Sequence, residues 1–335
     1  MGEIVAPEGS PLSVAVIGVE DMETSLHFYR DLIGLTAHAP ETWSGDGFEA
    51  LWHLPSGSSA TAVFCELPGC PVGRVLLLDF GDVKKKHIRP INAPRAIGLV
   101  NLNFYTDDIR ADTKKLQAQG FRFWSEPTFY EMTGAQGAPT EVVFDGPDSV
   151  AINLVELTGD DPNTRVGQMR AYVKEHGRTP TGFTPVVTTS HCATDIDKAV
   201  AFYEKVLKSG VLIDEILDRP EQNNFLNIPA DGRTAVKFMQ GNHMFGKIAL
   251  SMPLNYECHD LTPDAHAPNT GYIAQMFEVK DVGYAQRASA DLGAEVYAPI
   301  STYNIPGLGE VKAFTVRNPG SGALQMIFEN DMLVC

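Results

Sequence analysis

The sequence has few cysteines, and their spacing matches no disulfide framework or zinc site. Its 335 residues include five cysteines, an odd number, and no C-x-x-C motif. These features disfavour both a disulfide-stabilised domain and a Cys-rich zinc site. A reducing compartment is the expected environment. We predict a cytoplasmic location.

Long apolar runs and an export signal are also missing. No apolar stretch approaches the roughly 20 residues that span a bilayer. The first residues, MGEIVAPEGSPL, have neither the basic region nor the apolar region of a signal peptide. We predict neither export nor membrane association.

Positive charge is scarce, since 26 Lys and Arg stand against 42 Asp and Glu, a formal net charge of -16. Nucleic-acid binding needs clustered Lys and Arg, and the one basic run, Lys84-Lys85-Lys86-His87, has the character of a solvated linker. P-loop, G-x-G-x-x-G and G-x-S-x-G motifs are absent. The expected partner is a small-molecule substrate, with a homodimer possible and nucleic acid excluded.

The sequence does contain a long internal repeat. Residues recur 174 positions later in one regular series: Asp21, Phe28, Tyr29, Pro55 and Phe64 return as Asp195, Phe202, Tyr203, Pro229 and Phe238. Solenoid units run about 20–50 residues, so a repeat of this length indicates a duplicated domain.

Each half divides again into two units of βαβββ order. Leu12–Val19 is strand-like and Asp21–Leu32 has apolar residues at helical spacing. Strand-like stretches follow at Glu49–Leu54, Ala60–Leu67 and Gly73–Phe80, and the same order begins again at Leu99, Pro185 and Gly271. The sequence predicts an α+β fold of four βαβββ modules in two pairs.

The polar segment 158–183 separates the two halves and contains a predicted helix at Arg165–Glu175. A linker of this kind favours an N-terminal pair of modules in residues 1–157 and a C-terminal pair in residues 184–335. Crossed pairing of the modules is the alternative.

Four stretches of the sequence resemble a known family. VEDMETSLHFYRDLIGL and ATDIDKAVAFYEKVL resemble the first-module signature of the vicinal oxygen chelate superfamily, and FDGPDSVAINLVEL and VRNPGSGALQMIFE resemble its module-closing strand. The superfamily includes glyoxalase I, extradiol dioxygenases and bleomycin-binding proteins. The resemblance implies that paired modules curl into half-open barrels, or cups. It also implies a divalent metal held by His on a first strand and Glu on a last strand.

The positions that match the family's ligands carry other residues here. The first-strand positions are Val14, Asn101, Thr188 and Ala274, and the closing-strand positions are Asn153 and Gln325. Aliphatic, amide and hydroxyl side chains cannot replace the imidazole and carboxylate ligands of Zn, Fe or Mn. We therefore predict no metal and no other cofactor at the family's site. A metal held by the loop residues Cys258, His259, Asp260, Asp264 and His266 stays open.

Three residues are candidate acids or bases. Glu329 and Glu278 are in phase with the ligand positions Gln325 and Ala274, and burial in a cup would raise the pKa of a carboxylate. His191 lies on the face of its strand opposite Thr188, so it is either a core histidine or, if a bulge turns it, a catalytic one. We predict His191, Glu329 and Glu278 as catalytic residues.

Polar side chains in phase with the ligand positions are the candidate substrate-binding residues. They are Thr188, Ser190, Cys192 and Gln325 in the C-terminal cup and Asn101, Tyr105 and Asn153 in the N-terminal cup. Aromatic residues predicted near the rims, such as Trp43, Trp52 and Tyr130, could close on a ring-shaped ligand.

Polar cups without the family's metal ligands favour an enzyme that moves protons on a small oxygenated, aromatic or cyclic metabolite, as a lyase, isomerase or hydrolase. Two alternatives remain. One is a non-catalytic binding or sequestration protein, and the other is an extradiol-type dioxygenase with relocated metal ligands.

Overall fold

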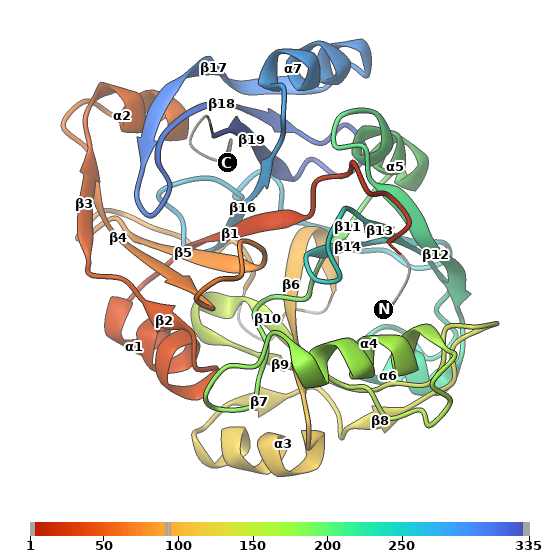
Figure 1. Cartoon of the computed structure of the whole chain (residues 1–335). Helices are drawn as coiled ribbons and strands as arrows, with labels where there is room; N and C mark the ends of the chain where they lie inside the picture. The colour runs from red at the N-terminus through yellow and green to blue at the C-terminus, as the bar shows by residue number, and fades with distance from the viewer. Residues whose placement is uncertain (1–3, 91–92, 94, 331–335) are drawn as a thin grey trace.

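The computed structural model describes residues 4–90, 93 and 95–330 and contains the four predicted modules (Figure 1). Module 1 consists of β1 (Leu12–Gly18), α1 (Met22–Leu26), η1 (His27–Leu32), β2 (Thr36–Ala37), β3 (Glu41–Ser44), α2 (Asp46–Trp52), β4 (Ser59–Glu66) and β5 (Arg74–Asp79). Module 2 consists of β6 (Ala96–Thr106), α3 (Ile109–Ala118), β7 (Arg122–Phe123), β8 (Thr128–Phe129), β9 (Thr140–Asp145), η2 (Pro147–Ser149) and β10 (Ala151–Glu156).

The second half repeats this order after α4 (Arg165–Glu175), which matches the predicted linker helix. Module 3 consists of β11 (Thr188–Cys192), α5 (Ile196–Lys205), β12 (Gly210–Leu217), α6 (Pro220–Phe225), β13 (Thr234–Gln240) and β14 (Lys247–Pro253). The strand β15 (His259–Asp260) precedes module 4, which consists of β16 (Gly271–Glu278), α7 (Val282–Asp291), β17 (Glu295–Ile305), β18 (Gly309–Arg317) and β19 (Leu324–Glu329).

The recurring aspartate of the sequence starts the main helix of each module. Asp21, Asp108, Asp195 and Asp281 are N-cap residues, and each side chain accepts a hydrogen bond from the backbone N–H three residues later. This contact satisfies a backbone donor that the helix leaves unpaired, and it contributes about 1 kcal/mol per helix. The repeat therefore conserves helix capping.

One predicted strand is a helix. The stretch Glu49–Leu54 lies largely in α2, whose buried residues Phe48, Leu51 and Trp52 are spaced three and four apart. That spacing places all three on one helical face, which packs against β17.

The strands form two sheets, and each sheet joins one module from each half. The first sheet has the order β17-β18-β19-β16-β1-β5-β4-β2, and the second has the order β12-β13-β14-β11-β6-β10-β9-β7. Module 1 is thus paired with module 4 through β1 and β16, and module 2 with module 3 through β11 and β6. The predicted pairing within residues 1–157 and within residues 184–335 is wrong, and the crossed alternative is correct.

The paired strands match in polarity, which gives a physical reason for the crossed arrangement. Val16 of β1 pairs with Ala274 of β16, whereas Asn101 and Asn103 of β6 pair with Ser190 and Thr188 of β11. Pairing within each half would place apolar side chains opposite amides on the same face and leave the amides without partners.

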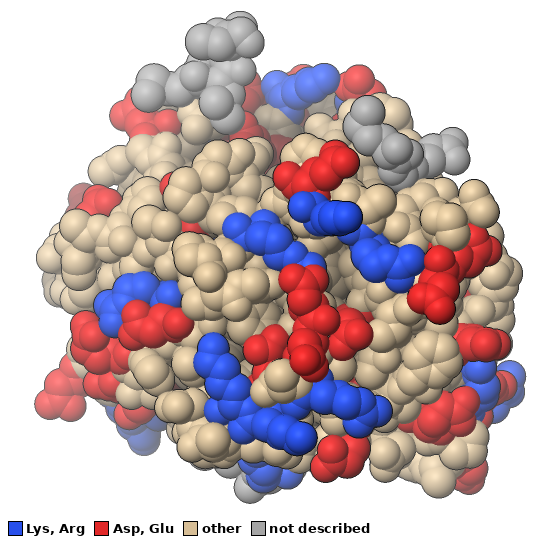
Figure 2. Space-filling view, turned by 60° about the horizontal axis from the view of Figure 1, so that its bottom comes forward, with Lys and Arg blue, Asp and Glu red and all other residues tan. Residues whose placement is uncertain are grey.

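The surface carries charges of both signs. Figure 2 shows one face of the molecule, on which groups of Lys and Arg lie beside groups of Asp and Glu. Exposed ion pairs include Lys86 with Asp264 at 3.0 Å and Lys280 with Glu8 at 2.9 Å. On the face in Figure 2 acidic groups interrupt the basic ones, unlike the continuous basic surface that binds a phosphate backbone.

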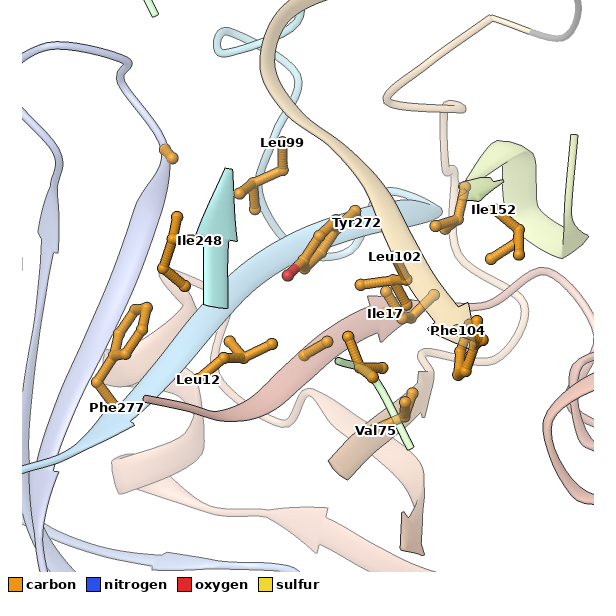
Figure 3. Close-up of a cluster of buried hydrophobic side chains, with 14 of the residues drawn as sticks. Leu12, Ile17, Val75, Leu99, Leu102, Phe104, Ile152, Ile248, Tyr272 and Phe277 are labelled. Carbon is orange, nitrogen blue, oxygen red and sulfur yellow. The ribbon is translucent and has the colours of Figure 1, made fainter. Parts of the chain in front are cut away.

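The largest core lies between the two sheets and the module helices. Figure 3 shows part of it, with Leu12 and Ile17 of β1, Leu102 and Phe104 of β6 and Tyr272 of β16 directed into one cluster. None of the helices in the described part of the chain is long and apolar enough to cross a membrane.

The two sheets enclose different interiors. The cup of modules 1 and 4, called here the filled cup, is packed with apolar side chains that include Trp43, Phe48, Trp52 and Met326. The cup of modules 2 and 3, called here the polar cup, contains a cavity.

Candidate functional site

The polar cup contains a cavity of about 160 Å³, close to the size that accommodates one small ring. Its walls come from the strands of modules 2 and 3, and Val166 and Met169 of α4 close one side. The linker helix α4 is therefore part of the site.

Strand pairing sets the floor of the cavity. Lys247 on β14 is opposite Thr188 on β11, Thr188 is opposite Asn103 on β6, and Asn103 is opposite Asn153 on β10. Side chains at paired positions lie about 4.5–5.5 Å apart at Cβ, so these four form a polar row across the floor. Ser190 and Asn101 form a second pair beside it.

Hydrogen bonds connect the polar side chains of the floor. The Ser190 hydroxyl donates to Oδ1 of Asn101, and Nδ2 of Asn101 donates to Oδ1 of Asn103. Nδ2 of Asn153 donates to Oε2 of Glu141 over 2.6 Å, while its Oδ1 is buried without a partner in the described residues. A buried acceptor of this kind can receive a hydrogen bond from a substrate hydroxyl.

Glu141 on β9 is one of two carboxylates that line the cavity, and the other, Glu215 on β12, accepts hydrogen bonds from Thr133. Oε1 of Glu141 accepts from the Tyr130 hydroxyl over 2.7 Å, and its Oε2 accepts from Asn153. Burial raises the pKa of Glu141, and these two hydrogen bonds lower it to a smaller extent. No Lys or Arg forms an ion pair with Glu141 in the described part of the structure. It is a positioned acid or base with a pKa moved toward neutral pH.

Lys247 is the amine of the cavity. Its side chain is 4% exposed, Nζ donates to the carbonyl oxygen of Met244, and it lies 5.9 Å from the centre of the Tyr105 ring. Burial lowers the pKa of Lys247 to about 7, because the desolvated ammonium has no carboxylate partner among the described residues.

Arg95 is a second buried cation of the same cavity. It is 7% exposed, its Nη2 donates to Oγ of Ser251 over 2.9 Å, and its Nε has no hydrogen-bond partner in the described residues. The thiols of Cys192 and Cys258 and the phenol of Tyr256 are its titratable neighbours. Among the described residues, Arg95 therefore presents a guanidinium without a carboxylate partner beside the cavity.

Five of the predicted substrate-binding residues lie together in this cavity: Asn101, Tyr105, Asn153, Thr188 and Ser190. The sequence assigned them to two cups, and the crossed pairing of modules brings them into one. Tyr130, predicted as a rim aromatic, also lines the cavity and stacks on Phe225 with ring centres 5.5 Å apart.

His191 does not face the cavity. It is 0% exposed and lies between the sheets, where Nε2 hydrogen-bonds the Tyr203 hydroxyl at 3.1 Å and Nδ1 hydrogen-bonds Oγ of Ser321 at 2.9 Å. Burial lowers its pKa to about 3. The structure places His191 away from the cup as a core histidine, so the geometry gives no support to its predicted catalytic role.

Gln325 and the two predicted carboxylates also lie outside the polar cup. Gln325 is buried between the sheets, where it hydrogen-bonds Tyr203 and Gln275. Oε2 of Glu329 accepts from the first backbone N–H of α7, at Val282, over 2.9 Å. Glu278 is half-buried, and its pKa is raised by burial and lowered less by Arg74. Glu278 and Glu329 line a different surface cavity of about 490 Å³.

Cys192 ends β11 beneath the polar cup, in an apolar cluster that Cys258 packs against. It is fully buried, and the contact with Cys258 and burial raise the pKa of its thiol. The other loop donors are dispersed: His259 lies in β15 and Nδ1 of His266 hydrogen-bonds the carbonyl oxygen of Ala267. In the described ranges these side chains do not come together as a metal-binding group.

Sequence reasoning missed Glu141, Lys247 and Arg95, three of the charged residues that line the polar cup. A usable signal was present for Lys247, since KIALSMP is an otherwise apolar strand with a lysine at its start. Glu141 and Arg95 gave no distinctive signal, because charged residues at strand ends are usually solvated.

The side chains on the floor do not fit the divalent metal that the family resemblance implies. The positions facing the cavity on the four central strands carry Asn, Thr, Ser, Ala, Lys, Tyr and Val. Neutral amides and hydroxyls are weak ligands for Zn or Fe, and the buried guanidinium of Arg95 in the same cavity would repel a metal cation. The donor set of this cup therefore differs from that of a metal-binding member.

Comparisons with known proteins agree with the fold. Residues 12–154 match the family model of the Glyoxalase/Bleomycin resistance protein/Dioxygenase superfamily. Glyoxalase I from Zea mays is similar at 15% identity, with a TM-score of 0.59 over 96% of this chain and 92% of that chain. A putative dioxygenase from Bacillus subtilis is similar at 13% identity, with a TM-score of 0.59 over 97% of this chain and 87% of that chain. No curated protein matches the sequence.

Proposed function

We propose that the polar cup is an active site that moves a proton on a small oxygenated metabolite. The match of residues 12–154 to the glyoxalase, bleomycin resistance protein and dioxygenase superfamily supports this proposal. The observation that carries the proposal is Glu141, a carboxylate with a raised pKa, held by two hydrogen-bond donors on the wall of a ring-sized cavity.

Glu141 has the properties of a general base. The Tyr130 hydroxyl and Nδ2 of Asn153 fix both carboxylate oxygens, while burial raises the pKa toward the pH at which proton transfer is efficient. In the proposed reaction Glu141 removes a proton from the carbon next to a substrate carbonyl or hydroxyl group. The same residue, once protonated, returns the proton at another position or to a leaving group.

The floor supplies the hydrogen bonds that hold the substrate oxygens. The hydroxyl of Thr188 and the amides of Asn103 and Asn153 lie in one row across the floor. Groups fixed by strand pairing need no reorganisation when charge develops on a substrate oxygen. Tyr130 and Tyr105 line the cavity, and aromatic side chains suit a cyclic or aromatic substrate. Together these features support an isomerase or lyase reaction.

Deuterium exchange tests the proposal even while the product is unidentified. The full chain would be incubated in D₂O with a panel of small ring-bearing oxo acids and hydroxy acids, and deuterium incorporation would be measured by NMR. We expect exchange of a carbon-bound proton in at least one compound. Glu141→Gln should lower the exchange rate about 10²–10⁴-fold, the usual contribution of a general base, and retain binding in a thermal-shift assay.

Glu66→Gln is the matched control, because Glu66 lies on β4 of module 1, outside the polar cup. It should leave the exchange rate unchanged. Exchange by Glu141→Gln at the wild-type rate would contradict the assigned base. Thermal stabilisation by a panel compound without exchange would instead identify a binding protein, the alternative class.

A further inference from the structure

Lys247 and Arg95 have no role in the proton transfer, yet both are buried cations beside the same cavity. Neither forms an ion pair with a carboxylate in the described residues. Burying a cation without a counter-ion is costly, and a protein that retains two of them in one cavity has a use for them. The two differ in chemistry, because an arginine stays charged while a desolvated lysine becomes a neutral amine.

Their positions define two ends of the cavity. Arg95 donates to Ser251, and Ser251 lies four residues after Lys247 on β14, on the same face of the strand. Four residues of a strand span roughly 13 Å. The residue between them on that face is Ala249, which lines the cavity and leaves space above the strand.

We propose that Lys247 forms a Schiff base with a carbonyl carbon of the substrate while Arg95 binds its carboxylate, so that the polar cup takes an oxo acid. The carbonyl and the carboxylate of this substrate are separated by a ring or a short chain, to span the distance between the two cations. The inference rests on the proposed function, in which Glu141 moves a proton of the same substrate.

The Schiff-base step balances without a further reactant. The Nζ lone pair of neutral Lys247 forms a bond to the carbonyl carbon, and a proton moves from nitrogen to oxygen to give a carbinolamine. The carbinolamine then loses its hydroxyl group with the second amine proton as one molecule of water, which leaves an imine. Protonation of the imine nitrogen makes the neighbouring C–H more acidic, and this C–H is the one from which Glu141 removes a proton.

Reductive trapping tests the proposal. The full chain would be treated at pH 7 with 4-carboxybenzaldehyde and sodium cyanoborohydride, which reduces an imine to a stable amine, and the modified peptide would be identified by mass spectrometry. We expect one label per chain at Lys247, because exposed lysines are protonated at this pH. Lys247→Met should abolish this label. Lys237→Met, which removes a lysine ion-paired with Asp214 at 2.7 Å, should not change it.

A second comparison tests Arg95. Arg95→Met should lower capture of 4-carboxybenzaldehyde at least about 10-fold, the effect of losing a charged hydrogen bond, and leave capture of uncharged benzaldehyde unchanged. Arg95→Lys retains the charge and serves if the methionine variant does not fold, with a partial loss expected. Equal loss for both aldehydes would overturn the role of Arg95.

The outcome for Lys247 is separable from that for Glu141. Labelling spread over surface lysines, or absent, in a protein that still shows Glu141-dependent exchange would overturn the Schiff base and leave the proposed function standing. Trapping at Lys247 without Glu141-dependent exchange would support the Schiff base and contradict the assigned base.

Discussion

Substitution of His191 should change the pH dependence of stability and leave the chemistry of the polar cup intact. His191 is fully buried between the sheets, and burial lowers its pKa to about 3 from an unperturbed value of 6.5. The folded protein therefore keeps His191 neutral at a pH where the unfolded chain binds a proton. Stability is highest above pH 6.5 and falls as the pH drops from 6.5 toward 3.

The size of the effect follows from the pKa shift. Each unit corresponds to 1.36 kcal/mol, so the shift to about 3 amounts to about 5 kcal/mol over the whole range. Between pH 6.5 and pH 5 the expected loss in the free energy of unfolding is about 2 kcal/mol. His191→Gln removes this loss, at a constant cost of about 1–3 kcal/mol for poorer hydrogen bonds to Tyr203 and Ser321.

Urea unfolding followed by circular dichroism between pH 5 and pH 8 measures the effect. The wild type should lose about 2 kcal/mol more than His191→Gln between pH 6.5 and 5. His27→Gln, at an exposed position of η1, is the control and should follow the wild type. Parallel curves for the wild type and His191→Gln would refute the reasoning. Loss of deuterium exchange in a folded His191→Gln protein would restore the catalytic role that the sequence suggested.

Three further predictions concern the two cups. Trp52→Ala should lower the free energy of unfolding by about 3–5 kcal/mol in denaturant titrations and leave ligand binding unchanged, because Trp52 is 1% exposed in the filled cup. The contact with Cys192 lowers the pKa of the Cys258 thiol to about 7, whereas burial raises the pKa of the Cys65 thiol to about 12. Cys258 should therefore react with iodoacetamide at pH 7.5 well before Cys65. Equal labelling of the two cysteines in peptide maps would contradict this. Lys247→Met should raise the free energy of unfolding by a few kcal/mol at pH 7 and by less toward pH 10. The reason is that the buried lysine destabilises the folded state most below its folded pKa of about 7. A stabilisation that does not change with pH would argue against burial of the charge as the cause.

The sequence was sufficient to predict most of the elements and the repeat, because these depend on local patterns. The capping aspartates, the helical spacing of apolar residues and the linker helix are all local features, and the structure contains each of them. Module pairing depends instead on which strand edges meet, and linker length gave the wrong answer. The polarity of the first strands was the better guide, since amides pair with hydroxyls and aliphatics with aliphatics.

An error of one residue explains the misplacement of Gln325 and Glu329. Glu156 accepts from the first N–H of α3 and Glu329 from the first N–H of α7, so the two modules are related by 173 positions. Asn153 then corresponds to Met326, whose side chain fills the other cup. Strand side chains alternate between the two faces of a sheet. An offset of 172 instead of 173 therefore assigned the ligand position to Gln325, whose side chain lies on the opposite face from the cup. A hydrogen bond that recurs at a helix start fixes such a register better than turn similarity.

Crossed pairing also determines how the two cups could diverge. A single chain with two dissimilar cups suggested that one half could lose its site and keep only a structural role, while the other half retained a site. In the structure each half contributes one module to each cup, so substitutions in one half alone affect both cups.

The apolar character runs through modules 1 and 4 together, with Val14 where module 3 has Thr188 and Ala274 where module 2 has Asn101. Arg74, which pairs with Val14 as Lys247 pairs with Thr188, is a buried cation that lies over the Phe64 ring. The filled cup thus has a buried cation at the position of Lys247, packed beside apolar side chains, and the proposed chemistry depends on modules 2 and 3 from the two halves of the chain.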